Sequence, residues 1–483
     1  MTEPGLFDVA VIGAGVVGAA IARELARYAL SVALVEAAPD VGMGTSKAST
    51  AIWHTGFDAK PSSLEARLLR RAYGLMEAFT AEAGIPVERT GALLVAWNAE
   101  QQAALPALFE KAGQNSVTDA RLVEAAEVYR LEPRLGPGAT GGMLVPGEGI
   151  LCTYTVPLAC ATQAVINGAT LKLNHAITGI RAGAGPGGFH VLESAAGEVR
   201  CRYLVNAAGL YSDEIDKLMG QAEFSVTPRR GELIIFDKFA RSLVRHVILP
   251  VPTAKTKGVL ISPTVYGNVL LGPTAEDLPR HGDSKRATET TAAGLRSLLE
   301  KGRAILPELL DEEVTATYAG LRAATEHSDY QIRLHAEQRY VCAGGIRSTG
   351  VSASLGIAEY VVGLLAQAGL GLRAKAEFKP VRMPNIGEAG VRPYQSAERI
   401  AADPRYGQIV CHCERVSLGE LLDATQAVIP ARTLDGLRRR TRAMQGRCQG
   451  FNCQAALIGL LLSSPATGQS AGRLTGLEAA RAA

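Results

Sequence analysis

A glycine turn between a strand and a helix near the start of the chain constrains the fold most. Residues 7–12 form an apolar run typical of a buried strand, and Gly13-Ala14-Gly15-Val16-Val17-Gly18 follows at once. Apolar residues then recur at helical spacing, and residues 31–36 have the pattern of a second strand that ends in Glu36. The pattern predicts a strand–helix–strand unit that binds a dinucleotide at the amino end of its helix.

The residue types of this turn suit a pyrophosphate. Gly13 permits the tight turn, Gly15 lets the backbone approach the ligand, and Gly18 lets the helix lie close to the sheet. The helix start offers free N–H groups and the positive end of the helix dipole, and Glu36 can accept hydrogen bonds from ribose hydroxyls. The alternative is a glycine turn required for steric reasons alone. We expect cofactor contacts from Gly13, Gly15, Val16, Val17, Gly18 and Glu36.

A second stretch, Gly183-Ala184-Gly185-Pro186-Gly187-Gly188, matches the same pattern formally. Residues 189–192 after it have the pattern of a strand, so no helix begins there to hold a phosphate. We expect a hairpin loop at this point and no separate NAD(P) site.

Length and composition limit the class of protein. The 483 residues are too many for one core and indicate two to four domains, and a net charge of +3 gives no reason to expect a nucleic-acid partner. No apolar run reaches the roughly 18 residues of a membrane span, and no signal peptide precedes the first strand. We therefore expect a cytoplasmic protein whose eight cysteines are thiols or metal ligands. Peripheral association with the inner face of a membrane stays compatible with the sequence.

Periodicity along the chain alternates between helix and strand. We expect helices over 63–83, 119–130, 286–304 and 353–367, mostly strand from 170 to 274, and a hairpin joining Val259–Ser262 to Val269–Leu271. Residues 376–400 contain three prolines without a clear period and are interpreted as a linker. Helices and four of the cysteines occupy 411–463, and the small polar residues after 465 predict a flexible tail.

Several motifs together resemble the D-amino-acid oxidase / glycerol-3-phosphate dehydrogenase superfamily of flavoproteins over about residues 6–370. Besides the glycine turn, the motifs are Gly44-Thr45-Ser46-Lys47-Ala48, Ile52-Trp53-His54-Thr55-Gly56-Phe57, Val205-Asn206-Ala207-Ala208-Gly209-Leu210-Tyr211, Arg229-Arg230-Gly231-Glu232, Leu271-Gly272-Pro273-Thr274-Ala275, Ala319-Gly320-Leu321-Arg322 and Gly344-Gly345-Ile346-Arg347-Ser348-Thr349-Gly350. The resemblance implies an α/β (α+β) fold with FAD as the nucleotide. It also implies further FAD contacts from Thr45, Ser46, Ala48, Ala208, Gly209, Gly345, Ile346, Ser348, Thr349, Gly350 and Val351.

The same resemblance implies a discontinuous domain organisation over residues 1–375. A Rossmann-like FAD-binding domain would comprise about 6–85, 145–220 and 335–375. An inserted antiparallel-sheet substrate domain would comprise about 86–144 and 221–334. The linker 376–400, a small helical domain over 401–465 and the tail 466–483 complete the chain.

An alcohol dehydrogenase of this kind needs a base and an anchor for an anionic substrate. His54 is the candidate base, because imidazole accepts a proton near neutrality; the alternative is a histidine that only packs in a loop or bonds the flavin. Arg322 and Arg347 are the candidate anion clamp, since guanidinium pairs bidentately with phosphate or carboxylate. The alternative for each arginine is a solvated surface charge. Lys257 fits the site or a solvent-facing turn equally well.

The late cysteines have the pattern CxC-x34-CxxxxC, formed by Cys411, Cys413, Cys448 and Cys453. Four thiolates bind a [2Fe–2S] cluster or one zinc, and zinc sites favour CxxC pairs, which are absent here. The surrounding sequence resembles the bacterioferritin-associated-ferredoxin-like (BFD-like) [2Fe–2S] domain, which implies that these four cysteines bind the cluster. Nearby arginines, Arg438, Arg439, Arg440, Arg442 and Arg447, would stabilise the reduced cluster or form a solvated basic face.

These observations predict an FAD-dependent dehydrogenase that takes a hydride from a small anionic hydroxy metabolite and passes electrons to the cluster. The resemblance makes sn-glycerol 3-phosphate the first substrate. A 2-hydroxy-acid (2-hydroxyglutarate-type) or amino-acid or amine dehydrogenase is the first alternative. An electron-transfer or iron-responsive subunit of a larger complex is the second. The final acceptor, a quinone or an electron-transfer protein, is left open, as are oligomerisation and additional subunits.

Overall fold

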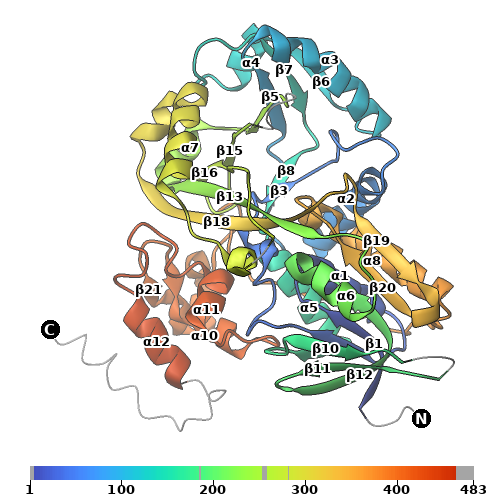
Figure 1. Ribbon diagram of the computed structural model, residues 1–483. Helices are drawn as coiled ribbons and strands as arrows, with labels where there is room; N and C mark the ends of the chain where they lie inside the picture. Colours follow the sequence, from blue (N-terminus) through green and yellow to red (C-terminus); the bar gives the residue numbers. More distant parts are fainter. Residues whose placement is uncertain (1–4, 184–186, 253–257, 281, 464–483) are drawn as a thin grey trace.

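The computed structural model describes residues 5–183, 187–252, 258–280 and 282–463. Lys257, residues 184–186 of the second glycine-rich stretch and the C-terminal tail lie outside these ranges. The chain forms two large mixed layers with a small helical body beside them (Figure 1). This is the mixed α/β architecture that the sequence predicts.

The first layer is a sheet of eight described strands that begins with the predicted strand–helix–strand unit. Strands β1 (Leu6–Ile12) and β2 (Val32–Val35) are parallel, with Val9 beside Val32, and α1 (Val16–Leu25) connects them. The sheet order is β10-β11-β12-β1-β2-β9, with β20 beside β12 and β19 beside β20. The other strands are β9 (Thr170–Lys172), β10 (Ile177–Arg181), β11 (His190–Ser194), β12 (Gly197–Asn206), β19 (Gln331–His335) and β20 (Tyr340–Gly344).

Four helices belong to this first layer, α2 (Leu64–Ala83), α5 (Thr155–Ile166), α6 (Ser212–Leu218) and α8 (Gly350–Gln367). By length and composition, helix α8 could cross a membrane, with a mean hydropathy of 1.3, whereas the sequence analysis expected no segment of this kind. Two-thirds of α8, 67%, is buried inside the protein. Its apolar residues pack in the same core as those of α1 and α5, so the fold itself accounts for its hydropathy.

The second layer is a mostly antiparallel sheet of nine described strands in the order β17-β13-β16-β15-β14-β5-β7-β6, with β18 beside β13. Its strands are β5 (Ala92–Ala96), β6 (Arg121–Glu124), β7 (Gly141–Val145), β13 (Val226–Phe236), β14 (Val247–Pro250), β15 (Leu260–Pro263), β16 (Val269–Gly272), β17 (Glu276–Asp277) and β18 (Val314–Thr325). Strands β15 and β16 form the predicted hairpin. Helices α3 (Ala99–Gln114), α4 (Ala125–Leu131) and α7 (Ala292–Ile305) accompany this sheet. The predicted domain boundaries stay a prediction.

Two predicted helices differ from the structure. The helix expected over 119–130 starts only at Ala125, because Arg121–Glu124 pairs with β7 as an edge strand and buries only Val123. The helix expected over 286–304 begins at Ala292, where the Thr291 side chain accepts a hydrogen bond from the N–H of Gly294. Both errors place a helix start too early, at a point where a capping or pairing interaction decides the boundary.

A small three-stranded sheet lies between the two large ones (Figure 1). Its strands are β3 (Ile52–Trp53), β8 (Gly149–Leu151) and β4 (Val87–Glu88), with β8 in the centre. The segment after β3 and the turn before β8 therefore lie close together, although about ninety residues separate them in the sequence.

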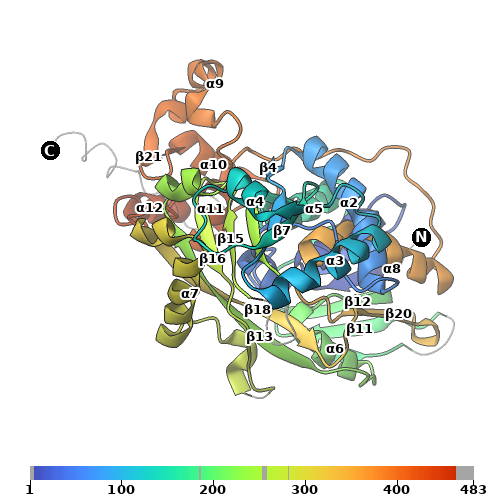
Figure 2. The same cartoon turned by 90° about the horizontal axis from the view of Figure 1, so that it is seen from above.

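An extended segment crosses the molecule from the end of α8 to the C-terminal body (Figure 2). It is anchored on its way: the N–H of Lys379 donates to Asn167 Oδ1 at 2.8 Å, and the N–H of Met383 donates to the Ala83 carbonyl at 2.7 Å. A short helix, α9 (Ala397–Ala402), begins at the end of the predicted linker 376–400. The C-terminal body then comprises β21 (Ile409–Cys411), β22 (Val416–Ser417), α10 (Leu418–Gln426), α11 (Leu434–Thr441) and α12 (Gln454–Ser463).

Candidate functional site

The glycine turn has no room for side chains. Gly13 has a φ of +99°, and a Cβ there would lie 2.5 Å from the Ala207 carbonyl oxygen. A Cβ on Gly18 would lie 1.9 Å from the carbonyl oxygen of Gly13. The first glycine permits the turn and the last one lets α1 pack against it, as the sequence predicts.

The loop after β2 folds over this turn. The N–H of Val16 donates to Ser46 Oγ at 2.9 Å, and the N–H of Gly42 donates to the Ala14 carbonyl at 2.9 Å. Glu36 accepts hydrogen bonds from the N–H of Ala14 at 2.6 Å and of Ala38 at 2.8 Å. Burial raises the pKa of the Glu36 carboxyl above its usual value, and these N–H groups oppose the shift.

A cavity of about 1450 Å³ extends from the glycine turn across the face of the first sheet to the second. This volume exceeds the roughly 300–1,000 Å³ of a site for one small ligand, so it has room for a dinucleotide and a substrate together. Gly18 packs behind the turn and does not line the cavity. The cavity is lined by the other predicted cofactor residues: Gly13, Gly15, Val16, Val17, Glu36, Thr45, Ser46, Ala48, Ala208, Gly209, Gly345, Ile346, Ser348, Thr349, Gly350 and Val351.

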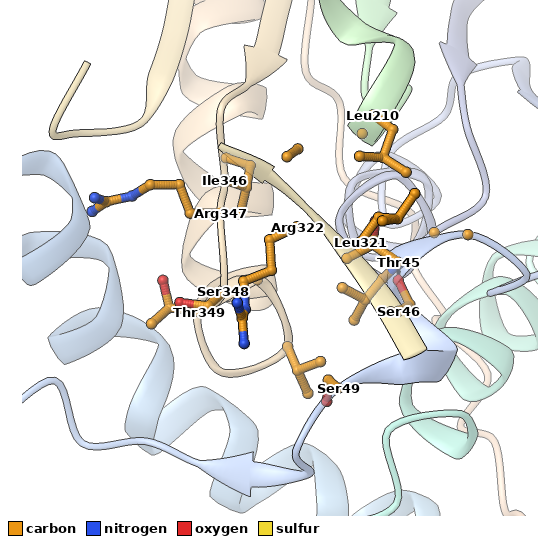
Figure 3. A pocket seen from close by; sticks show the side chains of 18 of the residues that line it. Thr45, Ser46, Ser49, Leu210, Leu321, Arg322, Ile346, Arg347, Ser348 and Thr349 are labelled. Atoms are coloured by element: carbon orange, nitrogen blue, oxygen red, sulfur yellow. Dashed lines mark hydrogen bonds between the residues drawn. The ribbon is translucent and has the colours of Figure 1, made fainter. Parts of the chain in front are cut away.

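Arg322 projects into this cavity from β18, toward Ser348 (Figure 3). Across the strand pair it lies opposite Arg229, whose charge is neutralised by Asp277 through bonds of 2.6 and 2.9 Å. The Arg322 side chain makes no ion pair or hydrogen bond with the described part of the chain. Burial lowers its pKa and Arg229 adds to the effect, but a guanidinium stays charged at neutral pH. The cavity therefore contains a cation that has no anionic partner among the residues the structure describes.

Arg347 lines the same cavity but extends away from Arg322, toward α2 (Figure 3). Its Nη2 binds Glu65, which also accepts a hydrogen bond from Thr349 Oγ1 at 2.7 Å. Arg347 has a φ of +53°, in the left-handed region that follows the turn at Gly345. The two arginines are thus in one site, and Arg322 is the one whose charge is uncompensated.

His54 follows β3 and lies between two carboxylates. Its Nδ1 is 2.9 Å from Glu148 Oε1, and its Nε2 is 3.1 Å from Asp58 Oδ1. Burial by itself lowers the pKa of His54, but the charges and hydrogen bonds of Glu148 and Asp58 outweigh it and raise the pKa well above its usual value. All three side chains line the cavity.

Several cavity residues were not found from the sequence. Glu148, Asp58 and Glu65 are ordinary acidic residues in the linear pattern, and only the fold brings them beside His54 and Arg347. His175 also lines the cavity, near Glu36, whose carbonyl accepts a hydrogen bond from the N–H of His175 at 2.8 Å. Glu148 lies between two glycines, Gly147 and Gly149, and this was the one local signal of a tight turn.

The four late cysteines come together as two pairs in the C-terminal body. Cys413 interacts directly with Cys448, and Cys453 with Cys411. Within the described residues, no three or more His, Cys, Asp or Glu side chains are arranged so that they could hold a single metal ion. Two thiol pairs suit a cluster with two irons better than a single zinc ion.

The loop that holds Cys448 favours a thiolate. Backbone N–H groups, that of Asn452 first, point at the Cys448 sulfur and lower its pKa below the usual value. Arg447 lies close enough to Cys413 for their charges to interact. The residues present therefore fit a [2Fe–2S] cluster in their chemistry.

The other four arginines of this group each pair with a carboxylate. Arg440 forms a buried bidentate pair with Asp40, with bonds of 2.6 and 2.8 Å, and donates to Tyr154 Oη at 2.8 Å. Both charged side chains are only 3% exposed. Arg438 and Arg439 pair with Asp435 on their own helix. The expectation of a solvated basic face or a cluster-stabilising set is thus wrong for Arg440, because its charge anchors the domain.

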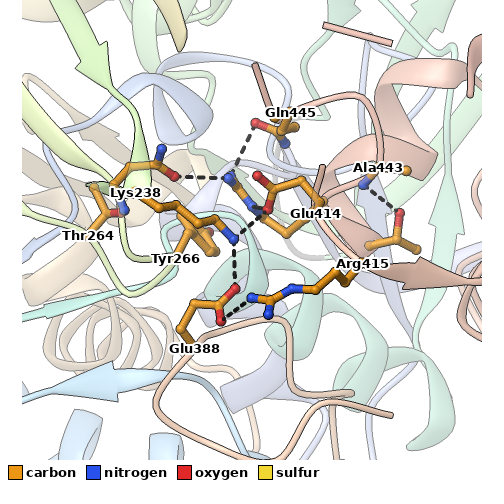
Figure 4. Close-up of polar contacts among 12 residues, drawn as sticks. Lys238, Thr264, Tyr266, Glu388, Glu414, Arg415, Ala443 and Gln445 are labelled. Carbon is orange, nitrogen blue, oxygen red and sulfur yellow. Dashed lines mark hydrogen bonds and ion pairs between the residues drawn. The ribbon is translucent and has the colours of Figure 1, made fainter. Parts of the chain in front are cut away.

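A second group of charges joins the C-terminal body to the segment after β13, the turn between β15 and β16, and the linker (Figure 4). Lys238 binds Glu388 at 2.7 Å and Glu414 at 3.1 Å. The buried Arg442 binds Glu414 at 3.3 Å, donates to Asn268 Oδ1 at 3.2 Å and lies 4.0 Å from the ring centre of Tyr266. The C-terminal body is therefore held by charged contacts at two separate places.

Comparisons with known proteins agree with this geometry. Residues 8–364 match the family of FAD dependent oxidoreductases (DAO), and residues 409–462 match the BFD-like [2Fe-2S] binding domain. A glycerol 3-phosphate dehydrogenase of Caloramator mitchellensis is 34% identical over 457 residues, which cover 94% of both chains. The human mitochondrial L-2-hydroxyglutarate dehydrogenase is 32% identical over 285 residues, 56% of this chain and 61% of that one.

A solved structure shows the same fold with its cofactor. The dithionite-reduced L-alpha-glycerophosphate oxidase of Mycoplasma pneumoniae with FAD bound has a TM-score of 0.74 and 26% identity, and the match covers 80% of this chain and all of that one. The chain belongs to the DAO family of FAD-dependent oxidoreductases. It is a member with a C-terminal BFD-like domain, and its cofactors are FAD and a [2Fe–2S] cluster.

Proposed function

We propose that the protein oxidises sn-glycerol 3-phosphate to dihydroxyacetone phosphate and passes the electrons to its own [2Fe–2S] cluster. The relatives named for glycerol 3-phosphate support the substrate, since one of them matches nearly the whole chain, C-terminal domain included. The observation that carries the proposal is the uncompensated Arg322 guanidinium inside the cavity. A small substrate with a phosphate supplies the missing anion.

Arg322 binds the phosphate and thereby fixes the position of the substrate. Charge-assisted hydrogen bonds contribute about 1.5–3 kcal/mol each, enough to set both affinity and orientation. Arg347 forms the edge of the same site, where Glu65 and Thr349 hold its side chain in place. FAD, when bound, supplies the hydride acceptor.

His54 takes the hydroxyl proton on this proposal. Removal of a hydride from carbon and a proton from oxygen converts the secondary alcohol to a ketone. Because Glu148 and Asp58 favour the imidazolium, Nε2 must first give its proton to Asp58, whose side chain is 35% exposed and can release it to solvent. Nε2 then accepts the proton of the substrate.

The C-terminal domain supports single-electron export. The substrate gives up two electrons together, whereas a [2Fe–2S] centre carries one, so a fused cluster suits a one-electron acceptor. The acceptor is a quinone or an electron-transfer protein.

An anaerobic titration of the purified protein tests the proposal. We expect sn-glycerol 3-phosphate to bleach the flavin and to produce the EPR signal of a reduced [2Fe–2S] cluster. Arg322→Met should raise the KM, while the matched change Arg229→Met, at a charge already paired with Asp277, should raise it much less. Bleaching by L-2-hydroxyglutarate or an amino acid but not by the phosphate would contradict the substrate. No bleaching by any of them, with a copurifying partner, would indicate an electron-transfer subunit.

A further inference from the structure

The turn before β8 buries a carboxylate directly behind His54. Glu148 is fully buried, and its Oε1 is 2.9 Å from His54 Nδ1. The same oxygen accepts from the N–H and from the Oγ1 of Thr55, both at 2.6 Å. The other oxygen, Oε2, is buried and has no hydrogen-bond partner among the described residues. The side chain is thus tied to His54 and its neighbour alone.

The backbone holds this carboxylate in place. The N–H of Gly91 donates to the Glu148 carbonyl at 2.9 Å, and Tyr73 Oη donates to the Gly147 carbonyl at 2.5 Å. A Cβ on Gly149 would lie 2.8 Å from the Glu88 carbonyl oxygen, so the turn cannot be rebuilt with a larger residue there. These contacts of the sheet and its turn fix the position of Glu148.

No cation other than His54 lies against the Glu148 carboxylate within the described chain. Tyr73 and Asp119 are the titratable groups beside the turn, and Arg89 is directed to Tyr73 Oη, the Gly147 carbonyl and Glu77. On the other side of the His54 ring, Asp58 is the charged group in contact with it among the described residues. A buried carboxylate with no further compensation needs the imidazolium as its partner. In agreement, Glu148 contributes to the raised pKa of His54.

We propose that Glu148 is a positioning residue that holds Nδ1 of His54 as a hydrogen-bond donor, so that Nε2 is the nitrogen that exchanges protons with Asp58 and the substrate. A carboxylate on one ring nitrogen fixes both the orientation and the tautomer of a histidine. Glu148 touches neither the reacting atoms nor the cofactor on this proposal, which rests on the role of His54 proposed above.

Glu148→Gln tests the proposal, because glutamine keeps the size of the side chain and removes its charge. We expect kcat to fall about tenfold or more with KM little changed, and the pH dependence of kcat to move to lower pH, because the imidazolium loses its buried counter-ion. The control Thr55→Val removes a hydrogen bond from the same oxygen but keeps the charge, so its pH dependence should stay in place. FAD content serves as the check that each variant is folded.

A second measurement does not depend on the substrate. The His54 ring can be titrated by NMR in protein labelled at the histidine Cε1, with Asn in place of His54 to assign the signal. We expect the pH midpoint of the His54 titration to be lower in Glu148→Gln than in the wild type, and to be unchanged in Thr55→Val. A wild-type midpoint and wild-type kcat in Glu148→Gln would overturn the role of Glu148. Failure of glycerol 3-phosphate to reduce the flavin, with the expected NMR shift, would instead overturn only the proposed substrate.

Discussion

The buried pair between Arg440 and Asp40 should decide how firmly the [2Fe–2S] domain is docked. Arg440→Met removes two bonds of 2.6 and 2.8 Å to a carboxylate that is 3% exposed. Breaking one side of a buried pair typically costs about 3–5 kcal/mol, because the remaining charge is left without a counter-ion. Asp40 keeps the Tyr154 hydroxyl at 3.0 Å and the N–H of Val41 at 2.8 Å, so we expect the lower end, about 3 kcal/mol.

A loss of about 3 kcal/mol lowers the docking equilibrium by about two orders of magnitude. Hydrogen-exchange mass spectrometry should show it as faster exchange in α11 and in the loop from Asp40 to Ala48, which lines the flavin cavity through Thr45, Ser46 and Ala48. The double change Asp40→Asn with Arg440→Met, which removes both charges, should recover part of the protection.

The control is Arg405→Met, at an arginine whose pair with Asp403 lies within the C-terminal segment and is half-exposed. It should leave exchange in α11 unchanged. If Arg440→Met also exchanges as the wild type does, the buried pair contributes nothing to docking, and the reasoning from burial is refuted.

Other outcomes follow from the same structure. Gly18→Ala should give protein without FAD, because the new Cβ would lie 1.9 Å from the carbonyl oxygen of Gly13, and the flavin absorbance after gel filtration checks this. Arg322→Met should raise the KM for an anionic substrate roughly 10- to 100-fold in steady-state assays, and an unchanged KM would exclude Arg322 as the anchor. Cys448→Ser should abolish the cluster EPR signal while the substrate still bleaches the flavin, and loss of both would contradict separate sites. In wild-type protein kcat should rise with pH through a midpoint above the ordinary value of histidine, because only the deprotonated His54 can act as base; a flat profile would rule it out.

The parts of the fold that depend on neighbouring residues could be predicted from the sequence. The strand–helix–strand unit and the steric roles of Gly13 and Gly18 rest on spacing within one segment, from Leu6 to Val35, and the structure confirms them. The β15–β16 hairpin is equally local, since its turn residues lie between two apolar runs. The early start predicted for the helix over 119–130 shows the limit, because pairing with β7 decides between strand and helix there.

The site residues that were missed depend on contacts between distant segments. His54 and Glu148 are 94 positions apart, and Asp40 and Arg440 are 400 positions apart. Neither acidic residue stands out in the linear pattern, because an isolated carboxylate is usually a surface group. Arg440 was misjudged for the same reason: a run of arginines on a short helix has the same pattern whether it faces solvent, a cluster or a buried aspartate.

The fixed position of the [2Fe–2S] domain determines where a redox partner has to bind. Arg440 binds Asp40 and Arg442 binds Asn268, so the domain is fixed to the rest of the protein and does not move between electron donor and acceptor. On the proposed route the electron passes from the cluster to the partner without movement of the domain. The partner must therefore approach the exposed side of the loop that holds the cysteine ligands, where Phe451 is 90% exposed. The turnover rate should then depend on the concentration of that partner. The rate of electron transfer from flavin to cluster should not change with the viscosity of the medium.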